Sequence, residues 1–465
     1  MTDLNFSGAG MTRTGRLVLV TMAVAFILAG CSTVPWKQAL SPAPASQVDP
    51  TTRPTPSSDE VFVVLAFSGG GTRSAAFSYG LLETLRDRTV KIDGKRRRLL
   101  DEVDVITSVS GGSYTAAYYG LFGERTFSDF EDRFLKRDVQ GELASILLNP
   151  LALASLATPA VNRSDLAAAW LGDNIFENKR FGDMSGHGGP MVIVNASDLN
   201  TGSTFSFVSR QFDFLCSKIG DFPVARAVMA SSAVPGYFAA VSVQNHPEDC
   251  AARHRPWVQA ALEKRDIYSR DYQVARALQR YLDPGRMPYV QLIDGGVTDN
   301  LGVRGSILSP ILHDGNVDEM RGAFSDGKLD RVKNVLVIVA NSQIYEDYRW
   351  SREGQEPGLV QTLSASFDSA IGIMNTETIG LARRGFMNWA DRVNKRPSRA
   401  GKAPVKLHFA ALTLDHIDDE QERSYFNSIP TTLSLPSHQV DEVRALSRRL
   451  LDNSPAYKSF LAELR

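Results

Sequence analysis

The stretch that decides the fold is VFVVLAFSGGGTRSAAFSYGLL, which runs from Val61 to Leu82. It opens with an apolar run typical of a buried strand and closes with the apolar spacing of a helix. Between them stand three consecutive glycines, Gly69, Gly70 and Gly71, whose conformational freedom is costly to fix. We therefore expect a strand-to-helix turn in which the backbone must stay free of side chains.

The same order of strand, turn and helix recurs along the chain. A second buried strand, in EVDVITSVS, runs into a glycine turn and an apolar helical pattern. Further strands are predicted in PMVIVNASDL, TFSFVS, YVQLIDGG, NVLVIVANS and VKLHFAALTL, and helices over 127–157, 224–231, 360–384 and 440–464. This alternation predicts an α/β fold with a mainly parallel central sheet covered by helices.

The composition is that of an ordinary globular protein. The 465 residues are 43% hydrophobic and 22% charged, with a formal net charge of -1. Nucleic-acid-binding proteins show a basic excess that is missing here. The seven histidines have no spacing typical of metal ligands, so we expect neither a nucleic-acid partner nor a metal site.

The N-terminal region differs from the rest of the chain. An apolar run ends in Leu-Ala-Gly-Cys31, which predicts a signal peptide over 1–30 and resembles the lipobox of bacterial lipoproteins. That resemblance implies a lipid on the Cys31 thiol, and the following Ser32 implies the outer membrane of a Gram-negative bacterium. A plain signal peptide that contains a cysteine is the alternative. Residues 31–58 are rich in Pro, Ser and Thr, so we expect a tether that joins the folded part to the cell envelope.

Two features of the folded region, 59–465, stay open from sequence alone. Cys216 and Cys250 either form a disulfide, which an exported protein allows, or are two separate buried thiols. Residues 245–288 are charged and aromatic, with helical spacing, between two stretches that carry motifs. We expect a helical insertion there, and a lid over the site is one role for it.

A second glycine turn carries a candidate nucleophile. The segment TSVSGGSY places Ser110 between a buried strand and a helix, where a nucleophile elbow of the form G-x-S-x-G holds its serine. In this chain Ser108 replaces the first glycine of the pattern, and Gly112 supplies the last. Both flanking residues are small, as such a tight turn requires.

A third turn carries a candidate base. In LIDGGVTDN a buried strand delivers Asp294 to a turn at Gly295 and Gly296. A carboxylate there either orders the turn or takes a proton from a serine hydroxyl. The three turns together contain a nucleophile, a base and backbone donors for an oxyanion, which are the groups that acyl transfer needs.

In this order the SGGGTR, S-x-S-x-G and DGG motifs resemble the patatin-like phospholipase family. The stretches NASDLNTGSTFSF and ASSAVPGYFAAV add to the likeness, which covers roughly 61–303. The resemblance implies a three-layer α/β/α patatin-like fold. It also implies a serine–aspartate dyad that hydrolyses the acyl esters of phospholipids or other lipids, with no histidine, metal or organic cofactor.

The family pattern carries over residue by residue. It makes Ser110 the nucleophile and Asp294 the general base. Two departures touch the backbone geometry, because Ser108 stands at the first glycine of the elbow and Ser74 at the glycine after the basic residue. The resemblance assigns the oxyanion hole to the backbone amides of Gly69, Gly70 and Gly71, with Arg73 at the family's basic position after them.

Two other readings remain open. Ser110, Asp294 and His416 also follow the Ser, Asp, His order of α/β-hydrolases, which would make the chain a triad esterase or acyltransferase. The second is a non-catalytic envelope lipoprotein that binds lipid or a partner.

Overall fold

The computed structural model describes residues 58–149, 156, 161–187, 189–246, 255–305, 331–345, 349–354 and 356–464. The predicted signal peptide, the tether, Cys31 and Cys250 therefore lie outside the described residues. Cys216 takes part in a disulfide.

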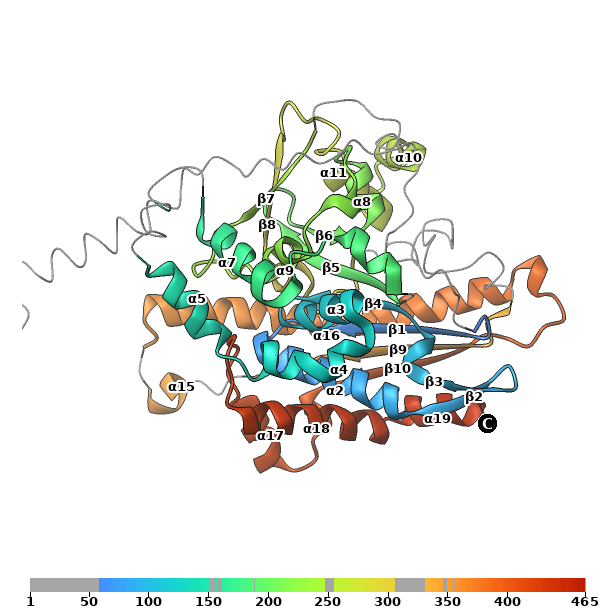
Figure 1. Cartoon of the computed structure of the whole chain (residues 1–465). Helices are drawn as coiled ribbons and strands as arrows, with labels where there is room; N and C mark the ends of the chain where they lie inside the picture. The colour runs from blue at the N-terminus through green and yellow to red at the C-terminus, as the bar shows by residue number, and fades with distance from the viewer. Residues whose placement is uncertain are drawn as a thin grey trace, which may run out of the picture.

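The core is built on one large sheet with the strand order β10-β9-β1-β4-β5-β8-β7, and β6 pairs with β5 (Figure 1). Strands β10, β9, β1, β4 and β5 run parallel to one another, whereas β6 and β8 run antiparallel to β5, and β7 to β8. The prediction of a mainly parallel sheet is confirmed. The strands are β1 (Val61–Phe67), β4 (Val103–Val109), β5 (Met191–Asp198), β6 (Ser203–Phe207), β7 (Val241–Gln244), β8 (Tyr289–Ile293), β9 (Asn334–Ala340) and β10 (Lys406–Leu412).

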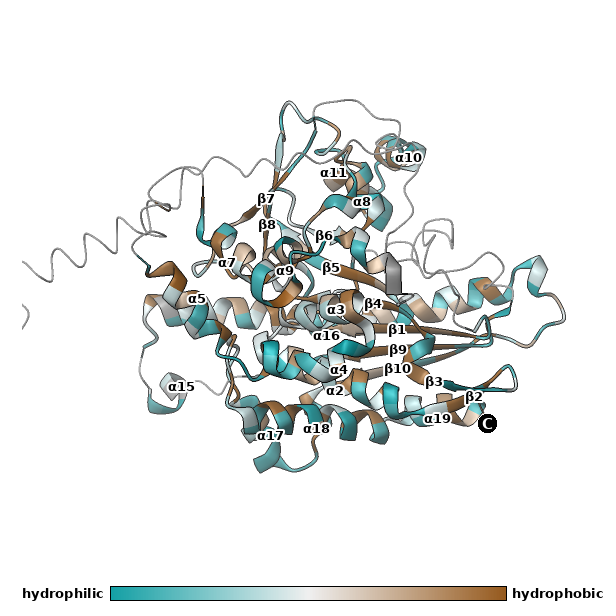
Figure 2. Ribbon diagram, viewed as in Figure 1, coloured by the Kyte–Doolittle hydropathy of each residue, from teal (hydrophilic) through white to brown (hydrophobic). Residues whose placement is uncertain are grey.

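Helices cover both faces of this sheet, which gives the three-layer arrangement. All seven residues of β1 are buried, and their side chains alternate between two cores. Val63 and Leu65 belong to the core under α2 (Gly71–Asp87), α3 (Gly111–Phe122) and α18 (Ser437–Asn453). Phe62 belongs to the core under α16 (Leu359–Asn394), where its ring lies 6.4 Å from that of Trp389. Strands buried on both faces are continuously apolar, as Figure 2 shows for the centre of the sheet.

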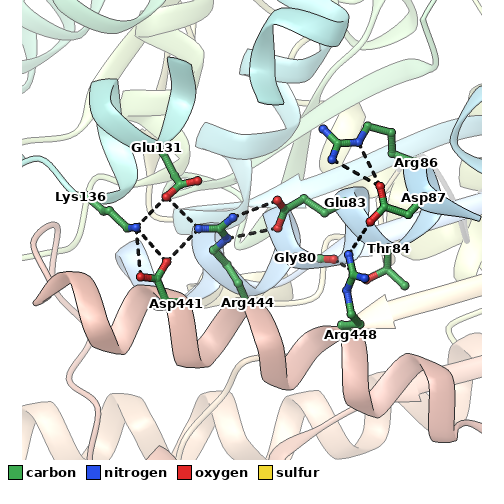
Figure 3. A network of polar contacts seen from close by, with 10 residues as sticks. All are labelled: Gly80, Glu83, Thr84, Arg86, Asp87, Glu131, Lys136, Asp441, Arg444 and Arg448. Atoms are coloured by element: carbon green, nitrogen blue, oxygen red, sulfur yellow. Dashed lines mark hydrogen bonds and ion pairs between the residues drawn. The ribbon is translucent and has the colours of Figure 1, made fainter. Parts of the chain in front are cut away.

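Helix α2, which follows the glycine loop, is fixed against α18 (Figure 3). Gly80 of α2 lies so close to α18 that a Cβ there would come within 2.4 Å of the Arg444 carbonyl oxygen. The Arg444 guanidinium pairs with Glu83 at 2.9 Å, Glu131 at 2.8 Å and Asp441 at 2.9 Å. Because Arg444 is only 18% exposed, solvent screens these pairs less than it screens surface pairs. The network holds the helix whose first turn borders the candidate site.

The helix boundaries differ from the sequence prediction at three places. The helix predicted over 360–384 continues to Asn394 in α16. The helix predicted over 440–464 is divided into α18 and α19 (Pro455–Glu463), because proline starts a new helix and cannot continue an old one. The helix predicted over 127–157 contains α4 (Thr126–Phe130) and α5 (Val139–Leu147), separated by a short π-helix (Glu131–Leu135) and a three-residue connection. Other described elements are β2 (Thr89–Ile92), β3 (Lys95–Arg98), α7 (Arg163–Leu171), α8 (Ser209–Asp213), α9 (Val224–Ser231), α12 (Gly296–Asp299), α15 (Arg349–Glu353) and α17 (Glu420–Asn427).

The segment predicted as an insertion contains two helices, α10 (Pro256–Lys264) and α11 (Arg270–Leu278). After α11, the Tyr281 hydroxyl donates to Asp198 Oδ2 at 2.7 Å, and the Tyr281 carbonyl accepts from Asn245 Nδ2 at 3.0 Å. The bond to Asp198 attaches the segment to the carboxyl end of β5, and the bond from Asn245 closes the segment on itself.

Candidate active site

Ser110 occupies a strained turn between β4 and α3. Its backbone has φ 47° and ψ −121°, a conformation that costs energy for a residue with a side chain. The Ser110 N–H donates to Ser231 Oγ at 2.8 Å, and Ser231 Oγ donates to the Asn195 carbonyl at 2.6 Å. This chain of hydrogen bonds ties the turn to α9 and β5, so the surrounding structure stabilises the strained conformation.

The structure brings Ser110 and Asp294 together, although 184 residues separate them in the sequence. Ser110 Oγ donates to Asp294 Oδ2 at 2.9 Å, and the second carboxylate oxygen, Oδ1, accepts from the Gly296 N–H at 2.8 Å. The backbone N–H of Asp294 donates to the Ala233 carbonyl at 3.0 Å. Gly295 donates to the Ser231 carbonyl at 3.0 Å, so the end of α9 and the loop after it position both the serine turn and the carboxylate.

Burial alters the acidity of this carboxyl group. Loss of solvent raises the pKa of Asp294 to about 6, and the hydrogen bonds from Gly296 and Ser110 partly oppose the shift because they favour the charged form. Ser110 is 9% exposed and Asp294 8% exposed. The pair is therefore a nearly buried hydroxyl beside a carboxylate that is ionised at neutral pH and is a better proton acceptor than an ordinary aspartate.

The glycine loop packs directly against the Ser110 turn. A Cβ on Gly111 would lie 2.0 Å from the Gly71 carbonyl oxygen, and one on Gly69 would lie 3.3 Å from Ser110 Cβ. Gly71 has φ 58°, and a Cβ there would come within 2.2 Å of the Thr432 carbonyl oxygen. Only glycine fits these contacts, which accounts for the glycine run in the sequence.

The loop amides differ in their availability. The Gly69 N–H donates to the Asn300 carbonyl at 3.0 Å, so it is already engaged and cannot serve an oxyanion as we expected without losing that bond. Within the described part of the chain, the N–H groups of Gly70 and Gly71 have no acceptor. Gly71 also begins α2, where the partial positive charge of a helix N-terminus favours an anion.

The Arg73 guanidinium is engaged by segments far along the chain. It donates to the Ser342 carbonyl at 2.9 Å, the Ile429 carbonyl at 2.5 Å and Thr431 Oγ1 at 2.9 Å. The residue is 3% exposed. Arg73 therefore supports the glycine loop from behind, by joining it to segments that follow β9 and α17, and these bonds do not direct its charge at Ser110.

The two departures from the family pattern are accommodated by hydrogen bonds. Ser108 Oγ donates to the Ile193 carbonyl at 3.0 Å, and Ser108 is absent from the described residues with positive φ, so a side chain fits there. Ser74 Oγ donates to the Ser68 carbonyl at 2.5 Å and so fastens the start of α2 to the end of β1. At the other end of the elbow, a Cβ on Gly112 would meet the Ser68 carbonyl oxygen at 2.7 Å.

His416 does not join the pair. It lies in the short turn Leu414–His416 after β10, is exposed, and its Nδ1 lies 3.3 Å from Thr413 Oγ1. Strands β9 and β1 separate β10 from β4, which at the usual strand spacing amounts to about 14 Å. The arrangement does not assemble the Ser, Asp, His triad. Across the described ranges, His, Cys, Asp and Glu side chains form no group of three or more that could hold a metal ion.

Four residues of the site were not singled out from the sequence. Ser231 and Asn300 fall in stretches whose motifs were recognised, so a closer reading of ASSAVPGYFAAV and DGGVTDN could have found them. Ser342 and Thr432 contact the glycine loop from more than 270 residues away, and no local pattern marks them.

The fold and the site define a class of protein. It is an α/β/α protein with a serine at a strand-to-helix elbow and a buried carboxylate beside it. The family profile of patatin-like phospholipases matches residues 65–307, which is just over half of the chain. The chain belongs to the patatin-like phospholipase family. Membership supports lipid acyl hydrolysis, an activity on lipid esters, at the level of the family.

Solved structures give weaker likenesses. Human GIVD cytosolic phospholipase A2 is 14% identical with a TM-score of 0.42, over 98% of this chain and 65% of that chain. VipD from Legionella pneumophila is 12% identical with a TM-score of 0.26, over 91% and 73% of the two chains. This chain thus spans 65% of the length of the human protein. A comparison with curated proteins found no match. No helix in the described ranges is both long enough and apolar enough to span a membrane.

Proposed function

We propose that this protein hydrolyses acyl esters of lipids, with Ser110 as nucleophile and Asp294 as general base. The observation that carries the proposal is the 2.9 Å hydrogen bond from Ser110 Oγ to Asp294 Oδ2 on a strained elbow beside the glycine loop. An Asp294 pKa of about 6 suits this role, because the carboxylate is available at neutral pH and accepts a proton readily.

The reaction has two steps. Ser110 Oγ attacks the ester carbonyl carbon while its proton passes to Asp294, and the negative charge on the carbonyl oxygen is stabilised by the free amides of Gly70 and Gly71. The tetrahedral intermediate then releases the alcohol, which takes the proton from Asp294 and leaves an acyl group on Ser110. In the second step Asp294 accepts a proton from water, the hydroxide attacks the acyl-serine, and the fatty acid leaves as Ser110 regains its proton.

Fatty-acid release from phospholipid vesicles and hydrolysis of a p-nitrophenyl ester test the proposal. We expect both activities in the wild-type protein, and their loss in Ser110→Ala and Asp294→Asn. His416→Ala is the matched control, because a dyad enzyme does not need this exposed histidine. Covalent labelling of Ser110 by a fluorophosphonate gives a separate readout. An inactive wild type that also resists the label would favour a lipid-binding protein without catalysis.

The proposal extends to location. The lipobox-like ending at Cys31 supports export and attachment of the protein to the cell envelope through a lipid, with the outer membrane favoured by Ser32. Feeding cells a labelled fatty acid tests this. The wild-type chain should carry the label and Cys31→Ser should not, and label in both would place the attachment elsewhere.

A further inference from the structure

The first half of α16 projects past the sheet. In Figure 1 its early turns extend to the left, beyond the strands, at the end where α2 begins and the carboxyl end of β1 therefore lies. Asn375, in mid-helix, marks the limit of the packed part, since its Nδ2 donates to Gln343 Oε1 in the segment after β9. The projecting segment, Leu359–Met374, is about 24 Å long at 1.5 Å per residue.

Apolar side chains on this segment face solvent. Leu359 is 77% exposed, Phe367 45% and Ile373 69%. Between 359 and 370, every described side chain except that of Ala365 is exposed. Asp368 is the single ionisable residue of the segment, and hydroxyl and amide groups supply the rest of its polar face. A helix that is exposed and nearly uncharged gains little stability in water by itself, which indicates that another surface covers it.

The apolar stripe does not continue the buried face of the same helix. Its exposed apolar residues, Leu359, Phe367 and Ile373, fall within an arc of about 120° at 100° per residue. The buried residues of the second half, Ala382 and Trp389 among them, are centred roughly 140° away around the helix. The stripe is therefore directed at something other than the core under α16.

The projecting segment connects to the candidate active site through few residues. Gln343, which binds Asn375, directly follows Ser342, whose Oγ would lie 2.9 Å from a Cβ on Gly70. Tyr345 is 50% exposed, and its ring edge would lie 3.9 Å from a Cβ on Gly372 of the segment. A surface that covers the stripe therefore lies next to the glycine loop.

A second exposed apolar group lies in the loop that binds the Asp294 backbone. In the loop after α9, Val234 is 39% exposed and Tyr237 74% exposed. The preceding residue, Ala233, accepts the backbone N–H of Asp294, so this loop also borders the catalytic pair. Tyrosines with an apolar ring and a polar tip are typical of membrane interfaces.

We propose that the projecting segment lies in the interface of a lipid bilayer and holds the mouth of the site at the membrane surface. This inference rests on the proposed lipid hydrolase function and names how the substrate is reached. A bilayer fits better than a charged protein partner, because the stripe offers apolar area and hydroxyl groups with almost no charge to pair. An amphipathic helix of this kind lies in the plane of the interface. The predicted lipid anchor at Cys31 would keep such a surface close.

Quenching by bromine atoms on lipid acyl chains tests the proposal locally, whatever else attaches the full chain to the vesicles. Phe367→Trp places a reporter in the stripe, and Gln361→Trp places one on the polar face, about 120° from Phe367 and about 160° from Leu359 around the helix. The parent chain supplies the background of the native tryptophans. On vesicles of phosphatidylethanolamine and phosphatidylglycerol, we expect brominated lipid to quench the tryptophan at 367 at least about twofold more than that at 361.

The outcomes separate this inference from the proposed function. Equal quenching at the two positions, or none at 367, overturns the membrane contact even if the enzyme hydrolyses a dispersed ester. If the tryptophan at 367 becomes shielded from solvent as the protein concentration rises, with no vesicles present, the stripe binds a second copy of the chain. That result also overturns the membrane contact. As a second measurement, Phe367→Ser should lower hydrolysis of vesicle lipid about tenfold or more and leave the dispersed ester unchanged. Equal loss on both substrates would contradict the proposal.

Discussion

Replacing Asp294 by Asn should make the protein more stable at neutral pH while it abolishes activity. The substitution keeps the shape of the side chain, with an oxygen for the Gly296 N–H and a group facing Ser110, but removes a carboxylate from a buried site. In the wild type, burial raises the pKa of this carboxyl from 3.8 to about 6. A shift of about 2 pKa units corresponds to roughly 3 kcal/mol, at 1.36 kcal/mol per unit.

The sign follows from proton binding. Below the unfolded pKa the carboxyl is protonated in both states and its burial costs nothing extra. As the pH rises towards the folded pKa, the unfolded chain loses the proton first, so the free energy of unfolding falls. This decrease in stability is complete above about pH 6. The Asn variant lacks this titration. Its advantage over the wild type should therefore be small near pH 4 and grow to about 3 kcal/mol by pH 7.

Urea unfolding of both proteins from about pH 4 to about pH 8 measures this difference directly. Ester hydrolysis on the same samples should fall by roughly two to four orders of magnitude in the variant. Ser110→Ala is the control, since it removes the hydroxyl but leaves the titrating carboxyl. A stability difference between Asp294→Asn and wild type that does not change with pH would refute the raised pKa, and full activity in the variant would refute the base assignment.

Other expectations follow from the same geometry. The kcat/KM of the wild type should rise with pH to a plateau, with its midpoint near the Asp294 pKa of about 6, and a flat profile on a p-nitrophenyl ester would assign the base elsewhere. Gly71→Ala should lower ester hydrolysis by about a hundredfold or more, because a Cβ would meet the Thr432 carbonyl oxygen at 2.2 Å, whereas Gly189→Ala, with open space around it, should match the wild type. Arg73→Met should lower the free energy of unfolding in urea by on the order of 3 kcal/mol, because it leaves the buried carbonyl oxygens of Ser342 and Ile429 without a hydrogen-bond donor. An unchanged unfolding midpoint would contradict the supporting role of Arg73.

The strand-to-helix turns could be predicted from the sequence because their requirements are local. Buried parallel strands are continuously apolar, and a backbone that approaches as closely as Gly71 does to Gly111 demands glycine whatever the rest of the chain does. The same local logic marked Ser110 and Asp294 as residues delivered by strands to tight turns. Their shared hydrogen bond followed from the resemblance to a known family and from no spacing rule.

The support of the glycine loop could not be predicted in this way. Thr432 binds the Thr72 N–H, and Ile429 binds Arg73 across 356 residues, so the contact partners carry no periodicity that relates them. The engagement of the Gly69 amide by the Asn300 carbonyl is equally long-range. A main-chain carbonyl is present at every residue, and only the folded chain decides which one reaches the loop.

The support of Arg73 by residues more than 350 positions downstream has a consequence for synthesis. Ser110 and Asp294 leave the ribosome well before Ile429 and Thr431, two of the groups that hold the Arg73 guanidinium. A partly made chain thus contains both reactive side chains but lacks the partners that fix the glycine loop. We expect such a chain to be inert towards esters, so that competence for catalysis begins only after the segment that contains Ile429 and Thr431 has been made.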